Sequence, residues 1–189
     1  MKIRFGLRAD ERLHPRDPDT RIVEELGLCQ GIARVDLAVV NGTIHGYEIK
    51  SERDTLARLP GQAEVYNRVL DHVTIVTALT HADDIRAFVP EWWGIWTVLD
   101  DQGEVRLEPL RDSARNPEVS AFALAQLLWR DEALQALADR GLAAGMRSKT
   151  RQSIWRRLAA ELTLEDLGQV VRERIKSRNS AWRSLEPPM

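Results

Sequence analysis

The sequence has a single cysteine, Cys29, and no long apolar run. One thiol excludes an internal disulfide and any zinc or iron–sulfur site that needs several cysteines, and we interpret Cys29 as a core residue. No apolar stretch approaches the roughly 20 residues that cross a bilayer, and no secretory signal follows the N-terminus. Aromatic residues make up only 6% of the 189 residues, but hydrophobic residues make up 43%, which is enough for a globular core. We therefore expect a cytoplasmic protein with no membrane partner.

The net charge of −2 conceals an uneven distribution along the chain. Residues 1–145 carry 17 basic and 24 acidic side chains, whereas residues 146–189 carry 10 basic and 5 acidic ones. Trp155 and Trp182 lie among the arginines of the second segment, and such a mixture of cations and rings can engage phosphates and bases. A solvated, arginine-rich helical face explains the same pattern, so both interpretations stand.

Apolar periodicity and turn residues predict a mixed α/β fold, an α+β sandwich with helices appended at the C-terminal end. The predicted strands cover 32–40, 43–50, 73–78, 94–99 and 104–110. The predicted helices cover 20–27, 61–70, 83–89, 117–128, 131–138, 150–162 and 164–176.

This pattern divides the chain into three parts. Residues 1–19 form an irregular segment, residues 20–112 form the sandwich, and residues 113–189 form a helical, basic extension.

The residues that carry chemistry lie on the two strands around Asn41-Gly42. Residues two apart on a strand share a face, so Glu48 and Lys50 point the same way. A two-residue loop would place Asp36 on the other face, whereas one extra loop residue sets Asp36 directly across from Glu48. The second register also gathers the apolar neighbours on the opposite face, so burial favours the register that joins the two carboxylates.

Two carboxylates at cross-strand distance repel each other unless a cation lies between them. Hard oxygen ligands of this kind suit Mg²⁺ or Mn²⁺, which lower the pKa of a bound water and stabilise charge that develops on a phosphate. The ammonium group of Lys50 would orient a water or neutralise the phosphate. An exposed Glu-x-Lys ion pair at a strand end is the common structural alternative. His45 falls on the face opposite Glu48, and we interpret it as structural.

The sequence resembles the PD-(D/E)XK nuclease superfamily in the order of three elements: Asp36, then Glu48-Ile49-Lys50, then Gln62-Ala-Glu-Val-Tyr66. The last element matches the Q-x-x-x-Y pattern of the RecB-like branch of that superfamily. The run from Glu48 to Gln62 is similar to a small bacterial and phage-associated group within that superfamily. The resemblance covers residues of about 20–100. Val35 stands where the superfamily often has proline, and the cysteines of iron–sulfur RecB-like nucleases are absent.

The resemblance implies a restriction-endonuclease-like αβββαβ core that hydrolyses DNA with Mg²⁺ (or Mn²⁺) and an activated water. It implies that Asp36, Glu48 and the backbone carbonyl of Ile49 hold the metal and that Lys50 is catalytic. It also implies a helical acid, Glu25, which reaches the metal directly or through water.

Several assignments stay open at this point. Glu24 competes with Glu25 for the role of helical acid. Gln62 and Tyr66 are four residues apart, so they share one helical face and can reach one place together. The resemblance implies that they bind the substrate or support the site, whereas an ordinary amphipathic helix with a polar edge is the alternative. Arg58 would touch a phosphate, or else is simply solvated.

The alternative function is a non-cleaving nucleic-acid-binding or protein-docking module on the same fold. The C-terminal helices would then hold a protein partner or a second copy of the chain. The residues do not distinguish DNA from RNA as the nucleic acid.

Overall fold

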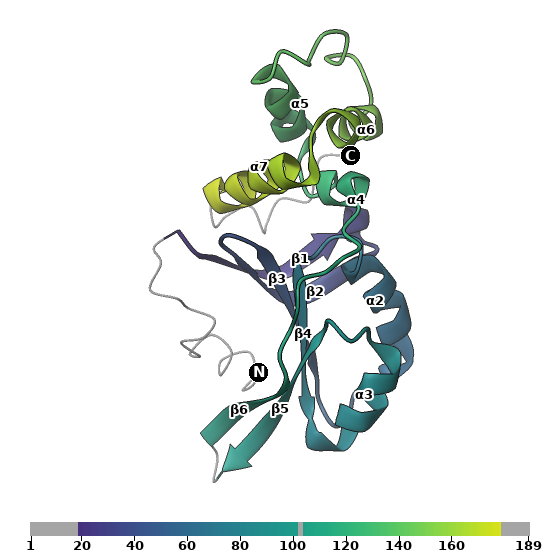
Figure 1. Ribbon diagram of the computed structural model, residues 1–189, viewed down its shortest axis with the longest axis vertical. Helices are drawn as coiled ribbons and strands as arrows, with labels where there is room; N and C mark the ends of the chain where they lie inside the picture. The colour runs from purple at the N-terminus through teal and green to yellow at the C-terminus, as the bar shows by residue number, and fades with distance from the viewer. Residues whose placement is uncertain (1–18, 102–103, 179–189) are drawn as a thin grey trace.

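The computed structural model describes residues 19–101 and 104–178 (Figure 1). Six strands form one mixed sheet in the order β1-β2-β3-β4-β5-β6. The pairs β3–β4 and β4–β5 are parallel and the other three are antiparallel. The strands are β1 (Arg21–Leu28), β2 (Ala33–Val40), β3 (Ile44–Lys50), β4 (His72–Ala78), β5 (Gly94–Asp101) and β6 (Glu104–Arg111).

Two helices connect the parallel strands, and within the described residues four more come after the last strand in the chain. The crossovers are α2 (Leu59–Tyr66) and α3 (Ala82–Phe88), and short 3-10 turns are η1 (Cys29–Gly31), η2 (Leu56–Arg58) and η3 (Leu79–His81). The C-terminal helices are α4 (Ala121–Ala125), α5 (Arg130–Ala138), α6 (Arg151–Glu161) and α7 (Leu164–Ser177). Figure 1 shows these four gathered at one end of the molecule, with the β5–β6 hairpin at the other. The predicted mixed α/β class is therefore confirmed, and the segment expected over 1–18 lies outside the described residues.

Residues 20–27 do not form the predicted helix, because they belong to strand β1, which pairs with β2 along its length. The apolar spacing of Ile22, Val23 and Leu26 predicts the helix, but only Val23 and Leu26 belong to the larger hydrophobic cluster, whereas Ile22 packs against the cluster on the opposite face. In the strand the spacing of Val23 and Leu26 arises because Glu25, between them, has a left-handed backbone with φ +53°, which interrupts the alternation of faces. A bent strand and a helical turn thus produce the same apolar spacing.

The predicted longer-loop register of the β2–β3 hairpin is confirmed. Leu37 pairs with Tyr47 and Ala38 with Gly46, which places Asp36 in the row of Glu48. The loop has three residues, and the Asn41 N–H donates to the Thr43 carbonyl oxygen at 3.0 Å.

One hydrophobic cluster joins the α2 face of the sheet to the C-terminal helices. It contains Val35 from β2, Tyr66 from α2 and Trp155 from α6, so the helical extension packs directly on the sheet. Trp155 is buried and its indole N–H donates to the Leu128 carbonyl oxygen at 3.0 Å. It is therefore a core residue and not a platform for bases, while Trp182 lies outside the described residues. No helix in the described part of the chain is long and apolar enough to cross a membrane.

A smaller polar and aromatic cluster lies on the opposite face of the sheet, around His45. Its Nε2 lies 2.8 Å from the Thr74 hydroxyl, its Nδ1 lies 3.2 Å from the Tyr47 hydroxyl, and its ring stacks on Tyr47. Burial and, to a smaller extent, the nearby His72 together lower the pKa of His45 to about 3. The structural interpretation of His45 agrees with these contacts.

Replacing Gly46 should destabilise the protein, because a Cβ there would lie 2.5 Å from Cδ1 of Leu70 and 3.1 Å from Cγ2 of Val35. We expect Gly46→Ala to lower the free energy of unfolding by about 1–3 kcal/mol in urea denaturation. Gly61→Ala is the matched control, since a Cβ at this helical position meets nothing within 4 Å; it should raise stability by up to about 1 kcal/mol. Equal effects of the two substitutions would contradict the packing argument.

Acid should weaken the fold through His45. Below an unfolded-state pKa of about 6.5, the unfolded chain binds a proton that the folded chain excludes, so stability falls as pH falls toward the folded pKa. We expect a loss approaching about 1.4 kcal/mol per pH unit from this group, measured by urea denaturation between about pH 6.5 and pH 5. His45→Gln should show a shallower decline, and parallel curves for the two proteins would refute the assignment.

Candidate active site

Five of the predicted residues meet where β2 and β3 lie against α2. Alternation along β3 sends Glu48 and Lys50 to the α2 side of the sheet, and the one-turn spacing of Gln62 and Tyr66 sends both side chains back toward β3. Asp36 reaches the same place from the neighbouring strand β2.

Lys50 and Glu48 form a buried ion pair. The Lys50 ammonium group donates to Oε1 of Glu48 at 2.7 Å, and the residues are 8% and 3% exposed. Gln62 bridges the pair, because its Oε1 accepts from Lys50 at 3.0 Å and its Nε2 donates to Glu48 Oε1 at 2.8 Å. The structural alternative, an exposed ion pair at a strand end, is therefore not what forms.

Tyr66 holds the other oxygen of the same carboxylate. Its hydroxyl lies 2.7 Å from Glu48 Oε2 and 2.9 Å from the Arg34 carbonyl oxygen, and its single proton serves one of them at a time. Burial raises the pKa of Tyr66, and the charges of Glu48 and then Asp36 raise it further. The hydroxyl is thus a firm hydrogen-bond donor. The part played by Arg34 was missed from the sequence, because a backbone carbonyl leaves no mark there.

Asp36 is fixed by the backbone of the neighbouring strand. Its Oδ2 accepts a hydrogen bond from the Ile49 N–H at 2.8 Å. The larger hydrophobic cluster includes Val35 on one side of Asp36 and Ala38 on the other, so the alternation of β2 is interrupted at this carboxylate. In a regular antiparallel ladder the Ile49 N–H would donate to a main-chain carbonyl of β2. Here it donates to the Asp36 side chain instead.

Glu25 lies on β1 and not on a helix, which corrects the predicted helical acid. The pairs Glu24↔Leu37 and Leu26↔Val35 bracket it, so it lies across from Asp36 in the row that also holds Glu48. Its side chain is 42% exposed, and Oε2 lies 4.0 Å from the Arg34 guanidinium.

Glu24 is the weaker of the two candidates. It pairs with Leu37, which belongs to the hydrophobic cluster on the opposite face of the sheet. Directly paired residues share a face, so Glu24 points away from the acid–lysine site.

Arg58 ends η2, next to the start of α2, and its side chain is exposed. Hydrogen bonds from Ser51 lower the pKa of the nearby Asp54 carboxyl most, and the charges of Lys50 and Arg58 lower it further. The structure thus places Arg58 beside the site and outside its buried network.

The donor chemistry of the site suits a hard cation. The expected ligands, Asp36, Glu48 and the Ile49 carbonyl, offer only oxygen, and Mg²⁺ is commonly held by one or two carboxylates with waters completing its shell. Among residues 19–101 and 104–178, no group of three or more His, Cys, Asp or Glu side chains is arranged to hold a metal ion. The side chains described therefore do not form a closed protein cage for a metal.

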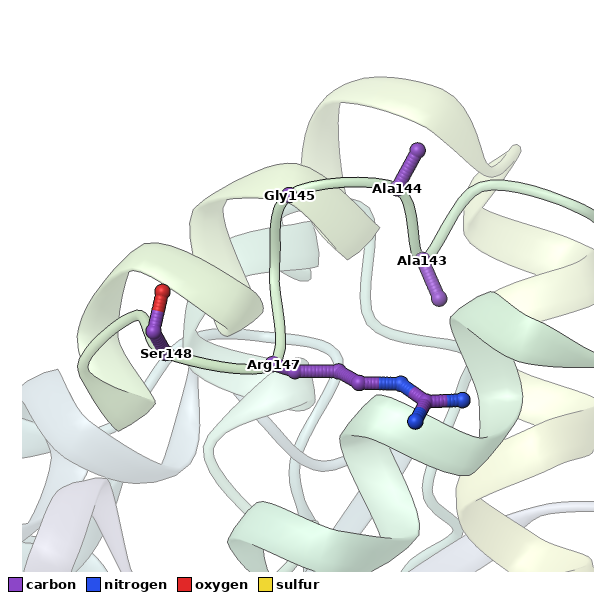
Figure 2. A pocket seen from close by; sticks show the side chains of 5 residues that line it. All are labelled: Ala143, Ala144, Gly145, Arg147 and Ser148. Carbon is purple, nitrogen blue, oxygen red and sulfur yellow. The ribbon is translucent and has the colours of Figure 1, made fainter.

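An open hollow of about 360 Å³ lies elsewhere, in the α5–α6 connection (Figure 2). Its lining residues are Ala143, Ala144, Gly145, Arg147 and Ser148. It shares no residue with the acid–lysine site.

Comparison with known proteins identifies the family of the chain. The family model described as Bacteriophage P4 protein cII matches residues 10–185. Protein cII of Enterobacteria phage P4 is 26% identical over 153 residues, which are 81% of this chain and 57% of that relative, so the chain spans little more than half of the relative's length.

Among solved structures, a protein of unknown function from Silicibacter pomeroyi, SPO1766, is similar at 20% identity with a TM-score of 0.44. The match covers 74% of this chain and 91% of that one. None of these descriptions states an activity, whereas the expected phage association is supported. Because the family match extends over nearly the whole sequence, the chain belongs to the bacteriophage P4 protein cII family.

Proposed function

We propose that this protein is a metal-dependent nuclease that hydrolyses DNA phosphodiester bonds with an activated water, on a PD-(D/E)XK core. The buried Lys50–Glu48 pair, held by Gln62 and Tyr66 beside Asp36, carries the proposal. Removing two charges from water is costly, and such groups concentrate at functional sites. A strand end with only a structural role would leave this pair in solvent.

The order of elements supports the same proposal. Three antiparallel strands, a helix and a strand parallel to the third follow one another as β1, β2, β3, α2 and β4. Asp36 lies on the second strand, Glu48 and Lys50 on the third, and the Gln62–Tyr66 element on the helix. This is the βββαβ part of the order that the resemblance implies.

Asp36, Glu48 and the Ile49 carbonyl would hold Mg²⁺ or Mn²⁺, with Glu25 reaching it directly or through water. A bound ion would lower the pKa of a water and stabilise charge on the phosphate. In the reaction, a bond forms from the water oxygen to phosphorus while the bond to the leaving oxygen breaks. The water loses one proton and the leaving oxygen gains one.

The protein side chains have separate parts in this reaction. The Lys50 ammonium group donates to a phosphate oxygen or to the attacking water, which stabilises the negative charge of the transition state. Gln62 and Tyr66 act as positioning residues, because their hydrogen bonds fix the Glu48 carboxylate. Arg58, exposed beside the site, would contact a flanking phosphate.

Asp36→Ala and Lys50→Ala should each reduce Mg²⁺-dependent cleavage by at least about 100-fold, because Asp36→Ala removes a carboxylate that would hold the metal and Lys50→Ala removes a cation that would stabilise charge on the phosphate. The assay uses circular single-stranded DNA and plasmid with Mg²⁺, Mn²⁺ or EDTA, beside linear DNA. Arg86→Ala is the control, because Arg86 is exposed on α3 and pairs only locally with Asp83. Cleavage by both variants at the wild-type rate would overturn the proposal. Binding of DNA without cleavage by the wild-type protein would favour the non-cleaving module.

Tyr66→Phe tests the positioning role, and Tyr47→Phe is its matched control. The chain has two tyrosines, and the Tyr47 hydroxyl contacts His45 on the opposite face. Tyr66→Phe leaves buried acceptors unpaired, which costs about 1–3 kcal/mol of stability, and should shift half-maximal cleavage to higher Mg²⁺ concentration. Tyr47→Phe should leave the Mg²⁺ dependence unchanged. The same Mg²⁺ dependence in both variants would show that Tyr66 is merely structural.

A further inference from the structure

A stretch of strongly positive charge covers the α5–α6 loop and α6. Between residues 140 and 160 the sequence contains no Asp or Glu and six cations: Arg140, Arg147, Lys149, Arg151, Arg156 and Arg157. All of these side chains except the half-buried Arg151 are exposed. This stretch is hereafter called the basic segment.

Three cations at the end of α7 have a different use, because they are paired within the fold. Arg174 lies 3.4 Å from Asp139, Lys176 pairs with Asp19, and the buried Arg178 lies 2.6 Å from Glu132. The positive charge predicted for the whole C-terminal segment therefore divides into two parts. These three cations are neutralised by acids of other segments, while the exposed cations of the basic segment face solvent.

Arg147 and Lys149 are the most available cations of the basic segment. Within the described residues neither has an ion-pair partner, whereas Arg157 pairs with Glu161 at 3.0 Å. The Arg130 guanidinium donates to the backbone carbonyl oxygens of Arg147 at 2.6 Å and Lys149 at 3.4 Å. The loop backbone is thus held without help from the two cationic side chains.

The open hollow in the α5–α6 loop lies next to the cations of the basic segment. Arg147 and Ser148 line it with the small residues Ala143, Ala144 and Gly145. Figure 2 shows the Arg147 side chain extended from the loop and the Ser148 hydroxyl nearby. A volume of about 360 Å³ leaves space for a hydrated phosphate.

The basic segment is tied to the end of the sheet that holds the acid–lysine site. The Arg151 guanidinium donates to Oε1 of Gln30 in η1, the turn between β1 and β2, at 3.1 Å. Because β2 and β3 are antiparallel, the start of β2 lies at the end of β3, where Lys50 stands. The exposed Arg34 lies on β2 between the turn and the site.

We propose that the basic segment binds the sugar–phosphate backbone of a nucleic acid and guides it past the β1–β2 turn to the acid–lysine site. This rests on the proposed nuclease function and names how its substrate is held. Cations without acidic neighbours supply affinity that is independent of base sequence. A protein partner fits less well, because interfaces need an apolar centre. None of the exposed large hydrophobic residues found in the described chain lies between residues 140 and 160.

The test measures binding of fluorescent duplex and single-stranded DNA by anisotropy, in EDTA, over a series of KCl concentrations. The double variant Arg147→Gln/Lys149→Gln should bind every DNA sequence more weakly than the wild-type protein. Its slope of log Kd against log salt concentration should be smaller by roughly 2, about one unit for each phosphate that is no longer neutralised. The control is Arg86→Gln with Arg115→Gln, which removes the same charge from exposed sites outside the basic segment and should keep the wild-type slope. Thermal melting checks that all variants are folded.

Because EDTA prevents metal-dependent cleavage, this experiment succeeds or fails independently of the nuclease proposal. The inference is overturned if the double variant keeps the wild-type slope, or if the control loses as much as the double variant does. It is also overturned if the wild-type protein ignores both DNAs and instead binds phosphatidylserine vesicles through Arg147 and Lys149.

Discussion

The buried pair of Lys50 and Glu48 sets the constraint on which the centre of the molecule depends. Two charges taken out of water at the end of a strand are stable only if their remaining hydrogen-bonding groups also find partners. Gln62 and Tyr66 supply those partners, so α2 must lie across β3 with one face toward it. Tyr66 also reaches the Arg34 carbonyl oxygen on β2. One polar network therefore sets the position of the helix against two strands.

Local patterns in the sequence predict most of the strands and the register of the central hairpin. Alternation around Asp36 and Glu48 admits two registers, and the longer-loop register forms. Leu37 and Tyr47 lie on the face opposite Glu48 as expected, but Val35 packs on the α2 face because the alternation of β2 is interrupted at Asp36. The error over residues 20–27 has a physical origin. Val23 and Leu26 show helical spacing, but the pairing with β2 that makes this segment a strand comes from residues further along the chain. The left-handed backbone of Glu25, which creates the spacing, has no signature in residue type, since glycine is usual there.

The sequence predicts which residues form the candidate site, but it does not predict that they are buried. Residue types and spacing group Asp36, Glu48 and Lys50, and the resemblance adds Gln62 and Tyr66, whereas the enclosure of the ion pair depends on packing of α2. Composition likewise identifies the basic C-terminal part without separating its two uses. The acids that neutralise α7, such as Glu132 and Asp139, belong to other segments, so a count along the sequence overstates the charge available to a partner.

The row of Glu25, Asp36 and Glu48 shows how the sheet is adapted to hold acids. Both β1 and β2 lose their alternation in this row, and a left-handed non-glycine residue such as Glu25 costs on the order of 1–3 kcal/mol. A regular ladder would avoid that cost, but it would bond the Ile49 N–H to a main-chain carbonyl and leave Asp36 without this anchor. The irregular backbone of this row thus lowers stability, but it fixes the Asp36 carboxylate near Lys50. It does so at the sheet end where Gln30 meets Arg151 of the basic segment. In the proposed nuclease, the acids would hold a metal and the exposed cations would hold the phosphates, and the fold brings both to one end of the sheet.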